Sequence, residues 1–194
     1  MKNLEIYIHI PFCVRKCEYC DFLSFPTDDD AKLRYVKGLM AEMIFYGPLM
    51  KNYQVSSVYI GGGTPSSIDE QWIAALMEGV FDCFNVLPDA EISIECNPGT
   101  LSREKLLAYR DAGINRLSIG LQSANNDELK LLGRIHTFEQ FVTNYEVARN
   151  VGFKNINVDL MYGLPGQSAS QYMATVNKII RLHPDHISEY SLIV

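Results

Sequence analysis

The segment Leu4-Glu5-Ile6-Tyr7-Ile8-His9-Ile10 alternates apolar and polar residues, and the segment Cys13-Val14-Arg15-Lys16-Cys17-Glu18-Tyr19-Cys20 follows it closely. Alternation with a period of two is typical of a β-strand, because successive side chains point to opposite faces of a sheet. Three cysteines within eight residues then occupy the loop that leaves the strand. We therefore expect a first strand that delivers a cysteine-bearing loop to one edge of a sheet.

The rest of the chain repeats this succession of strand and helix. The expected strands span residues 4–10, 57–60, 91–95, 116–120, 155–160 and 186–194, and the first helix spans residues 31–46. Later helices are expected to begin at the favoured capping sequences Ser67-Ile68-Asp69-Glu70, Ser102, Thr137-Phe138-Glu139-Gln140 and Ser168 or Ser170. Strand–helix alternation predicts parallel strands joined by right-handed crossovers. The expected fold class is therefore α/β, a partial (β/α)6 barrel of parallel strands.

The number of strand–helix units also bears on the domain organisation. Six units are fewer than a complete (β/α) barrel requires, and the chain stops inside the apolar run Tyr190-Ser191-Leu192-Ile193-Val194. A strand of this kind normally needs a covering helix, because its apolar face must be buried. We expect residues 1–194 to be one core domain that is truncated at strand six, with a C-terminal domain absent.

Composition and charge exclude several classes of protein. The chain has 194 residues, 47% of them hydrophobic and 21% charged, with a formal net charge of −6. No basic stripe of the kind that binds nucleic acid is present. No apolar run approaches the roughly 18 residues of a membrane span, and the N-terminus lacks the apolar core of a signal peptide. We expect a cytoplasmic protein with neither a nucleic-acid partner nor a membrane span.

The clustered cysteines indicate metal chemistry. The chain has five cysteines, and clustered thiols in a reducing compartment favour a metal site or catalysis over a disulfide framework. Three thiolates can hold three irons of a four-iron cluster and leave the fourth iron open to a ligand. Arg15 and Lys16 would favour the thiolate form. On spacing alone, a zinc site completed by a histidine and a set of inert thiols remain alternatives.

Further candidate residues stand where other strands end. Gly61-Gly62-Gly63-Thr64-Pro65 follows the second strand, and its glycines would let the backbone approach a ligand closely. Glu95 ends the third strand and could accept hydrogen bonds from ribose hydroxyls. Gln122 follows the fourth strand, and Asp159 is a charge inside the fifth, which is costly without a partner or ligand. Arg134 could clamp a carboxylate. The structural alternatives are a plain turn for the glycine run, a solvated acid for Glu95 and a solvated cation for Arg134.

Two of these segments resemble the signatures of one superfamily. The loop Cys13–Cys20, with the aromatic Tyr19 directly before its third cysteine, resembles the signature of the radical S-adenosylmethionine (SAM) superfamily. Gly61-Gly62-Gly63-Thr64-Pro65 resembles the glycine-rich SAM motif of the same superfamily. The resemblance implies a radical SAM core that holds a [4Fe-4S] cluster on Cys13, Cys17 and Cys20. It also implies SAM as a second cofactor, cleaved by one electron to a 5′-deoxyadenosyl radical.

The resemblance extends from Ile6 to Leu192 within one branch of the superfamily. This branch contains the oxygen-independent coproporphyrinogen III oxidases and the radical SAM haem chaperones. It implies that the cofactor-binding residues are Tyr7, Tyr19, Gly62, Gly63, Thr64, Glu95, Gln122, Arg134 and Asp159. No separate catalytic side chain is expected, because the cofactor performs the chemistry.

One departure separates the two kinds of protein in this branch. The oxidases carry a further cysteine two residues after the third, where this chain has Phe22, and they extend further before the first strand. The chain therefore resembles the haem chaperone subgroup, which implies a porphyrin or haem ligand, an electron donor protein and a haem-accepting protein. The alternative is an oxidase that decarboxylates coproporphyrinogen in porphyrin biosynthesis.

Overall fold

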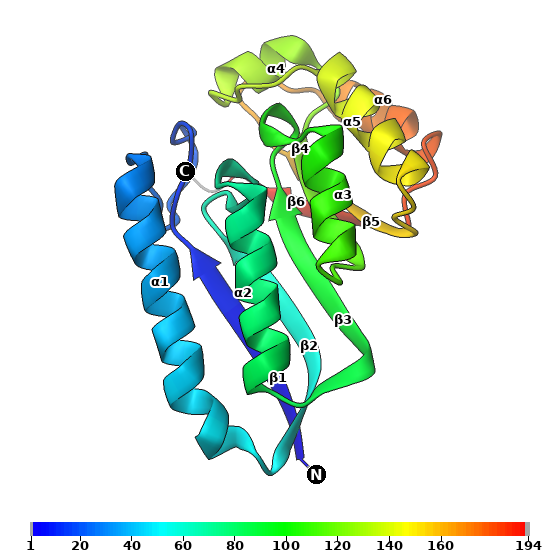
Figure 1. The fold of residues 1–194 in the computed structure, drawn as a ribbon. Helices are drawn as coiled ribbons and strands as arrows, with labels where there is room; N and C mark the ends of the chain where they lie inside the picture. Colours follow the sequence, from blue (N-terminus) through cyan, green and yellow to red (C-terminus); the bar gives the residue numbers. More distant parts are fainter. Residues whose placement is uncertain (1, 193–194) are drawn as a thin grey trace.

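The computed structural model describes residues 2–192. Six parallel strands form one sheet in the order β1-β2-β3-β4-β5-β6 (Figure 1). The strands are β1 (Lys2–Ile10), β2 (Tyr53–Gly62), β3 (Val86–Cys96), β4 (Arg116–Gln122), β5 (Asn155–Tyr162) and β6 (His186–Ser191). The helices are α1 (Asp29–Tyr46), α2 (Glu70–Cys83), α3 (Arg103–Asp111), α4 (Asn126–Leu131), α5 (Phe138–Asn150) and α6 (Ala169–Ile180). The 3-10 turns are η1 (Gly47–Met50), η2 (Pro65–Ser67) and η3 (Pro98–Thr100). The predicted α/β partial barrel is confirmed.

Most strands are longer than their apolar patterns predicted. β2 and β3 begin several residues earlier than expected, because β2 already pairs with β1 at Tyr53 and with β3 at Val55 opposite Val86. Breaks in register interrupt the pairing of β1 with β2, of β2 with β3 and of β4 with β5. β6 ends at Ser191, and positions 193 and 194 of the predicted last strand lie outside the described residues.

The starts of α3, α5 and α6 were predicted correctly, whereas α1 begins at Asp29, two residues before its expected start, and the start of α2 differs as well. Asp69, not Ser67, caps this helix, and its carboxylate accepts a hydrogen bond of 2.8 Å from the backbone N–H of Gln71. Ser67 lies in η2 and donates its hydroxyl to the carbonyl of Phe12 at 3.2 Å. Because the Ser67 hydroxyl is engaged with this distant segment, Asp69 caps α2 instead. Capping side chains elsewhere are Ser102, Thr137 and Ser168, and the last two form capping boxes.

The two faces of the sheet have opposite character. Helices α1, α2 and α3 lie side by side over one face (Figure 1). Beneath the helical layer, Ile94, Leu117 and Ile119 are fully buried in the apolar core. Alternate residues such as Glu95 and Ser118 line a cavity on the other face. Parallel sheets are usually apolar on both faces, so a polar inner face indicates that it serves a ligand. Within residues 2–192, no helix combines the length and apolarity that crossing a membrane requires.

Candidate functional site

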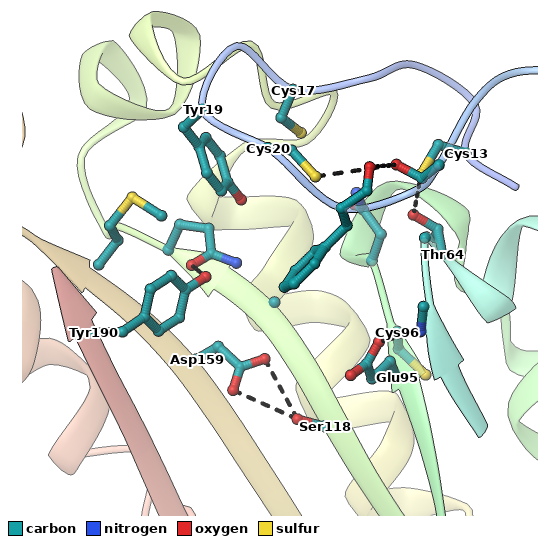
Figure 2. Close-up of a pocket in the computed structure, with 18 of the residues that line it drawn as sticks. Cys13, Cys17, Tyr19, Cys20, Thr64, Glu95, Cys96, Ser118, Asp159 and Tyr190 are labelled. Carbon is teal, nitrogen blue, oxygen red and sulfur yellow. Dashed lines mark hydrogen bonds between the residues drawn. The ribbon is translucent and has the colours of Figure 1, made fainter. Parts of the chain in front are cut away.

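A cavity of about 870 Å³ lies between the inner face of the sheet and the loop that follows β1 (Figure 2). Its lining comes from the cysteine loop, from the carboxyl ends of β2 and β3, and from inward positions of β4, β5 and β6. All but one of the predicted site residues line it, namely Cys13, Cys17, Tyr19, Cys20, Gly62, Gly63, Thr64, Glu95, Gln122, Arg134 and Asp159. Folding therefore gathers residues from six separate segments into one space.

The three loop cysteines each have a polar neighbour, and Figure 2 shows those of Cys13 and Cys20. Cys13 Sγ lies 3.3 Å from the hydroxyl of Thr64, and Cys20 Sγ lies 4.0 Å from the hydroxyl of Ser24. Arg134 Nη1 donates to Cys17 Sγ at 3.7 Å. Among residues 2–192, no three or more His, Cys, Asp or Glu side chains are already grouped to hold a metal ion.

Gly63 lets the glycine-rich segment come close to the cysteine loop. A Cβ at this position would lie 3.0 Å from Cys13 Sγ and 2.9 Å from both the Phe12 carbonyl and Ser24 Cβ. Backbone hydrogen bonds hold the two segments together, because Gly63 N–H donates to the Ile10 carbonyl at 2.9 Å and Thr64 N–H to Phe12 at 2.8 Å. Any larger residue at Gly63 would push the loop away from the end of β2.

The other end of the cysteine loop is fixed near β5 and β6. Tyr19 packs against the small apolar cluster of Leu132, Met161 and Leu164. Glu18 N–H donates to the Leu132 carbonyl at 3.2 Å, so the loop reaches across from β1 to the segment after α4. Burial raises the pKa of Tyr19 to about 12, although the nearby Arg134 acts in the opposite direction.

Arg134 connects three parts of the site. Its guanidinium donates to Cys17 Sγ, to the hydroxyl of Tyr19 at 3.3 Å, and to the Gly120 carbonyl at the end of β4. Its Nε is buried and has no hydrogen-bond partner in the part of the chain that the structure describes. A fixed cation therefore lies between the cysteine loop and the sheet, with one donor unused.

Glu95 has both carboxylate oxygens engaged. Tyr59 donates its hydroxyl to Oε1 at 2.8 Å, and Gly62 N–H donates to Oε2 at 3.0 Å. Burial raises the pKa of Glu95, and these two hydrogen bonds act against the rise. The carboxylate is thus held in one orientation at the wall of the cavity.

Asp159 is the second buried carboxylate of the cavity. It accepts hydrogen bonds from Asn157 Nδ2 at 2.7 Å and from the Ser118 hydroxyl at 3.3 Å. Burial raises its pKa, while Asn157 and Ser118 oppose the rise. A charge inside a strand requires partners, and the hydrogen-bond partners of Asp159 are neutral donors on β4 and β5.

Gln122 reaches the cavity through an irregularity of β4. Its φ is 77°, a left-handed value that is uncommon outside glycine, and the pairing of β4 with β5 shifts register between Gly120 and Gln122. Bulges of this kind re-aim side chains next to functional sites. The Tyr190 hydroxyl donates to Gln122 Oε1, which fixes the amide.

Tyr7 is the predicted site residue that does not line the cavity. It is 58% exposed, and its hydroxyl hydrogen bonds with His9 Nδ1 at 2.9 Å. Its ring stacks on that of Tyr59, with centroids 6.2 Å apart. Contact of Tyr7 with a cofactor therefore stays a prediction.

Comparison with known proteins decides the class of this protein. The family model described as the radical SAM superfamily matches residues 7–179, which include the cysteine loop and the carboxyl ends of β1 to β5. The chain belongs to the radical SAM superfamily. The resemblance inferred from the cysteine loop and the glycine-rich segment is confirmed.

Relatives place this radical SAM chain in a narrower group. It is 39% identical over 197 residues to the heme chaperone HemW of Escherichia coli strain K12, covering 98% of this chain and 51% of that protein. It is 40% identical over 189 residues to HemW of Bacillus subtilis strain 168, covering 97% and 50%. The solved structure of coproporphyrinogen III oxidase HemN from Escherichia coli is similar, with a TM-score of 0.92, 33% identity, and coverage of 99% and 44%. The chain spans about half the length of the curated relatives it matches.

Several residues of the radical SAM cavity were missed from the sequence. They are Tyr59, Arg116, Ser118, Asn157, Ser188 and Tyr190. Within β4 and β5, the missed polar residues alternate with apolar ones that face the helices. This alternation was the available signal, because a parallel strand with a polar residue at every second position has one face that is not packed in a core.

Proposed function

We propose that this chain holds a [4Fe-4S] cluster on Cys13, Cys17 and Cys20 and binds SAM in the adjoining cavity. The observation that carries the proposal is that these thiols share one cavity with predicted SAM-binding residues from β2, β3, β4, β5 and the segment after α4. Thiolates are the usual ligands of iron–sulfur clusters, and three of them leave one iron free for SAM. The close approach at Gly63 supports the fit, because a Cβ there would crowd Cys13 Sγ at 3.0 Å.

The charges of the cavity suit SAM. SAM carries a sulfonium and an ammonium against one carboxylate, so it is a net cation near neutral pH. The lining holds three carboxylates, of Asp21, Glu95 and Asp159, and three guanidinium groups, of Arg15, Arg116 and Arg134. An unused, buried Nε on Arg134 is suited to the carboxylate end of SAM. The lining thus has acceptors for the cationic and hydroxyl groups and a donor for the anionic one.

The chain's own residues would bind, orient and enclose the cofactor. When bound, the cluster and SAM would together supply radical chemistry. Glu95 would accept hydrogen bonds from the ribose, and Gln122 would present an amide held by Tyr190. The cysteine loop, fixed at Tyr19 by an apolar cluster, would limit the access of water to the site.

We further propose that the whole protein is a haem chaperone that acts in the cytoplasm, with an electron donor and a haem-accepting protein as partners. Support comes from the HemW relatives, at 39% and 40% identity over nearly all of this chain. Phe22 also stands where the oxidases are expected to carry a further cysteine. The second candidate is a coproporphyrinogen III oxidase, favoured by the fold likeness to HemN at a TM-score of 0.92.

Two assays test these proposals. SAM binding to anoxically reconstituted protein, measured by equilibrium dialysis, tests the cofactor site, and absence of binding by protein that contains its cluster would overturn it. Titration with haem, followed by absorption, is then compared with conversion of coproporphyrinogen under anoxic conditions. Haem binding without conversion supports the chaperone, whereas turnover of coproporphyrinogen selects the oxidase.

A further inference from the structure

We propose that Tyr59 is a positioning residue that holds the Glu95 carboxylate ready for the two ribose hydroxyls of SAM. The inference rests on the proposed SAM site and adds to it a residue that the family resemblance does not name. Tyr59 lies on β2 and Glu95 on the neighbouring strand β3, and both line the cavity. Because Tyr59 acts through Glu95, it need not touch SAM itself.

The contacts of Glu95 define its orientation. The Tyr59 hydroxyl donates to Oε1 at 2.8 Å, and the backbone N–H of Gly62 donates to Oε2 at 3.0 Å. Two donors on different oxygens fix the plane of the carboxylate, which one donor would leave free to rotate. The β2 strand therefore supplies both contacts that set the direction of an acid on β3.

The held carboxylate keeps the capacity to bind a diol. Each carboxylate oxygen can accept about two hydrogen bonds, so each retains one acceptor site after Tyr59 and Gly62 have donated. Two adjacent ribose hydroxyls match two acceptor oxygens of one planar group. Hydrogen bonds to a charged acceptor are stronger than neutral ones, so its orientation bears directly on affinity.

Gly61 gives a physical reason for the first glycine of the glycine-rich segment. A Cβ there would lie 2.8 Å from the Tyr59 ring and 3.1 Å from both Cδ and Oε1 of Glu95. Even alanine would push the tyrosine and the carboxylate apart. The glycine therefore leaves the space in which Tyr59 and Glu95 meet.

Tyr59 is itself held on its other side. The Tyr7 ring stacks on it at a centroid distance of 6.2 Å and an interplanar angle of 27°. The hydroxyl of Tyr7 is in turn hydrogen bonded to His9 at 2.9 Å. An aromatic row on β1 and β2 thus leads to the acid on β3, which gives Tyr7 a role that needs no contact with the cavity.

The electrostatic surroundings of Glu95 make the Tyr59 contact measurable. Asp159 on β5 disfavours the ionised form of Glu95, and His9 on β1 favours it. Tyr7, Tyr59 and Cys96 are further titratable groups that interact with this carboxylate. Burial has the largest effect and raises the pKa of Glu95, whereas the Tyr59 hydroxyl lowers it. Removal of that hydroxyl should therefore raise this pKa further.

The test compares SAM affinity from about pH 5 to pH 8 in four reconstituted proteins, since Glu95 must be ionised to bind well. They are wild type, Tyr59→Phe, Glu95→Gln and the control Tyr145→Phe. Tyr145 accepts one hydrogen bond of 2.7 Å from Arg149 on α5, so the control removes a comparable contact away from the cavity. Circular dichroism and cluster content confirm that each variant is folded and loaded.

We expect Tyr59→Phe to weaken SAM binding by about threefold to tenfold at neutral pH, the range for one lost hydrogen bond. The acidic limb of its affinity profile, the range in which SAM affinity falls as pH decreases, should move to higher pH. Glu95→Gln should lose the part of this limb that Glu95 contributes, while the part due to Asp159 remains, and Tyr145→Phe should match wild type. Gly61→Ala keeps the hydroxyl but displaces it, and should resemble Tyr59→Phe.

The failures of the two proposals are distinguishable. An unchanged affinity and an unmoved acidic limb in Tyr59→Phe, beside a wild type that binds SAM, would overturn this inference alone. A weaker affinity with an unmoved limb would also overturn it, because it would mark a merely structural effect. A cluster-loaded wild type that does not bind SAM would overturn the proposed cofactor site, and this inference with it.

Discussion

Ile94 and Glu95 are neighbours on β3, yet they belong to opposite faces of the sheet. Ile94 is fully buried beneath the helices, whereas Glu95 lines the cavity and has its pKa raised by burial. The same division runs along β4, where Leu117 and Ile119 join the core and Ser118 joins the cavity. Alternate residues of one strand therefore carry stability and ligand binding, and substitutions should separate the two properties.

The largest expected effect is on the cavity side. Cys17→Ser should reduce cluster iron to about a tenth of wild type or less, because the cluster then lacks one of its three thiolates. Iron and sulfide analysis after anoxic reconstitution measures this. The matched control is Cys83→Ser, since Cys83 ends α2 on the helical side and packs against the core. Equal iron in both variants would contradict the assignment of the loop.

Substitutions on the helical side of the sheet should lower the stability of the protein. Ile94→Ala should lower the free energy of unfolding by about 2–5 kcal/mol, because it leaves a cavity in a packed core. Urea unfolding of the ligand-free protein measures this loss. The same variant should keep most of its SAM affinity under conditions where it is folded. If Ile94→Ala lost as much SAM affinity as Glu95→Gln, the two faces would not have separate roles, which would contradict the comparison.

A third substitution tests whether a buried carboxylate that is predicted to bind SAM lowers the stability of the ligand-free fold. Because folding raises the pKa of Asp159 above its usual 3.8, the folded state binds the proton better, and stability falls as pH rises through that window. Asp159→Asn should therefore raise the melting temperature of the ligand-free protein at neutral pH. It should also weaken SAM binding by about tenfold, as expected when a charged partner is lost. A lower melting temperature in Asp159→Asn would show that this carboxylate stabilises the fold.

The smallest effect concerns a buried histidine beside the site. Burial lowers the pKa of His136 from 6.5 to about 3, and Arg134 adds to this shift. The contribution of neutral His136 to stability is fully present above pH 6.5 and is lost as pH falls toward 3. His136→Gln should flatten the dependence of the unfolding free energy on pH in this window. An unchanged slope would show that His136 is not protonated on unfolding there.

Local patterns predicted the strands and most of the helices, and the resemblance to the radical SAM superfamily supplied most residues of the candidate site. The alternation of β1 and the strand–helix succession gave the fold, and the cysteine loop and glycine-rich segment gave the cofactors to expect. Tyr59 was not predictable in this way, because its role depends on the register that brings β2 beside β3. The contact of Ser67 with Phe12 and the left-handed φ of Gln122 likewise arise from tertiary packing.

The most direct test of the central claim is the electron paramagnetic resonance spectrum of the reconstituted, dithionite-reduced protein, recorded with and without SAM. A four-iron signal that changes when SAM is added is the predicted result, since SAM would bind the iron that Cys13, Cys17 and Cys20 leave open. A four-iron signal indifferent to SAM, or no cluster signal from folded protein, would contradict the account.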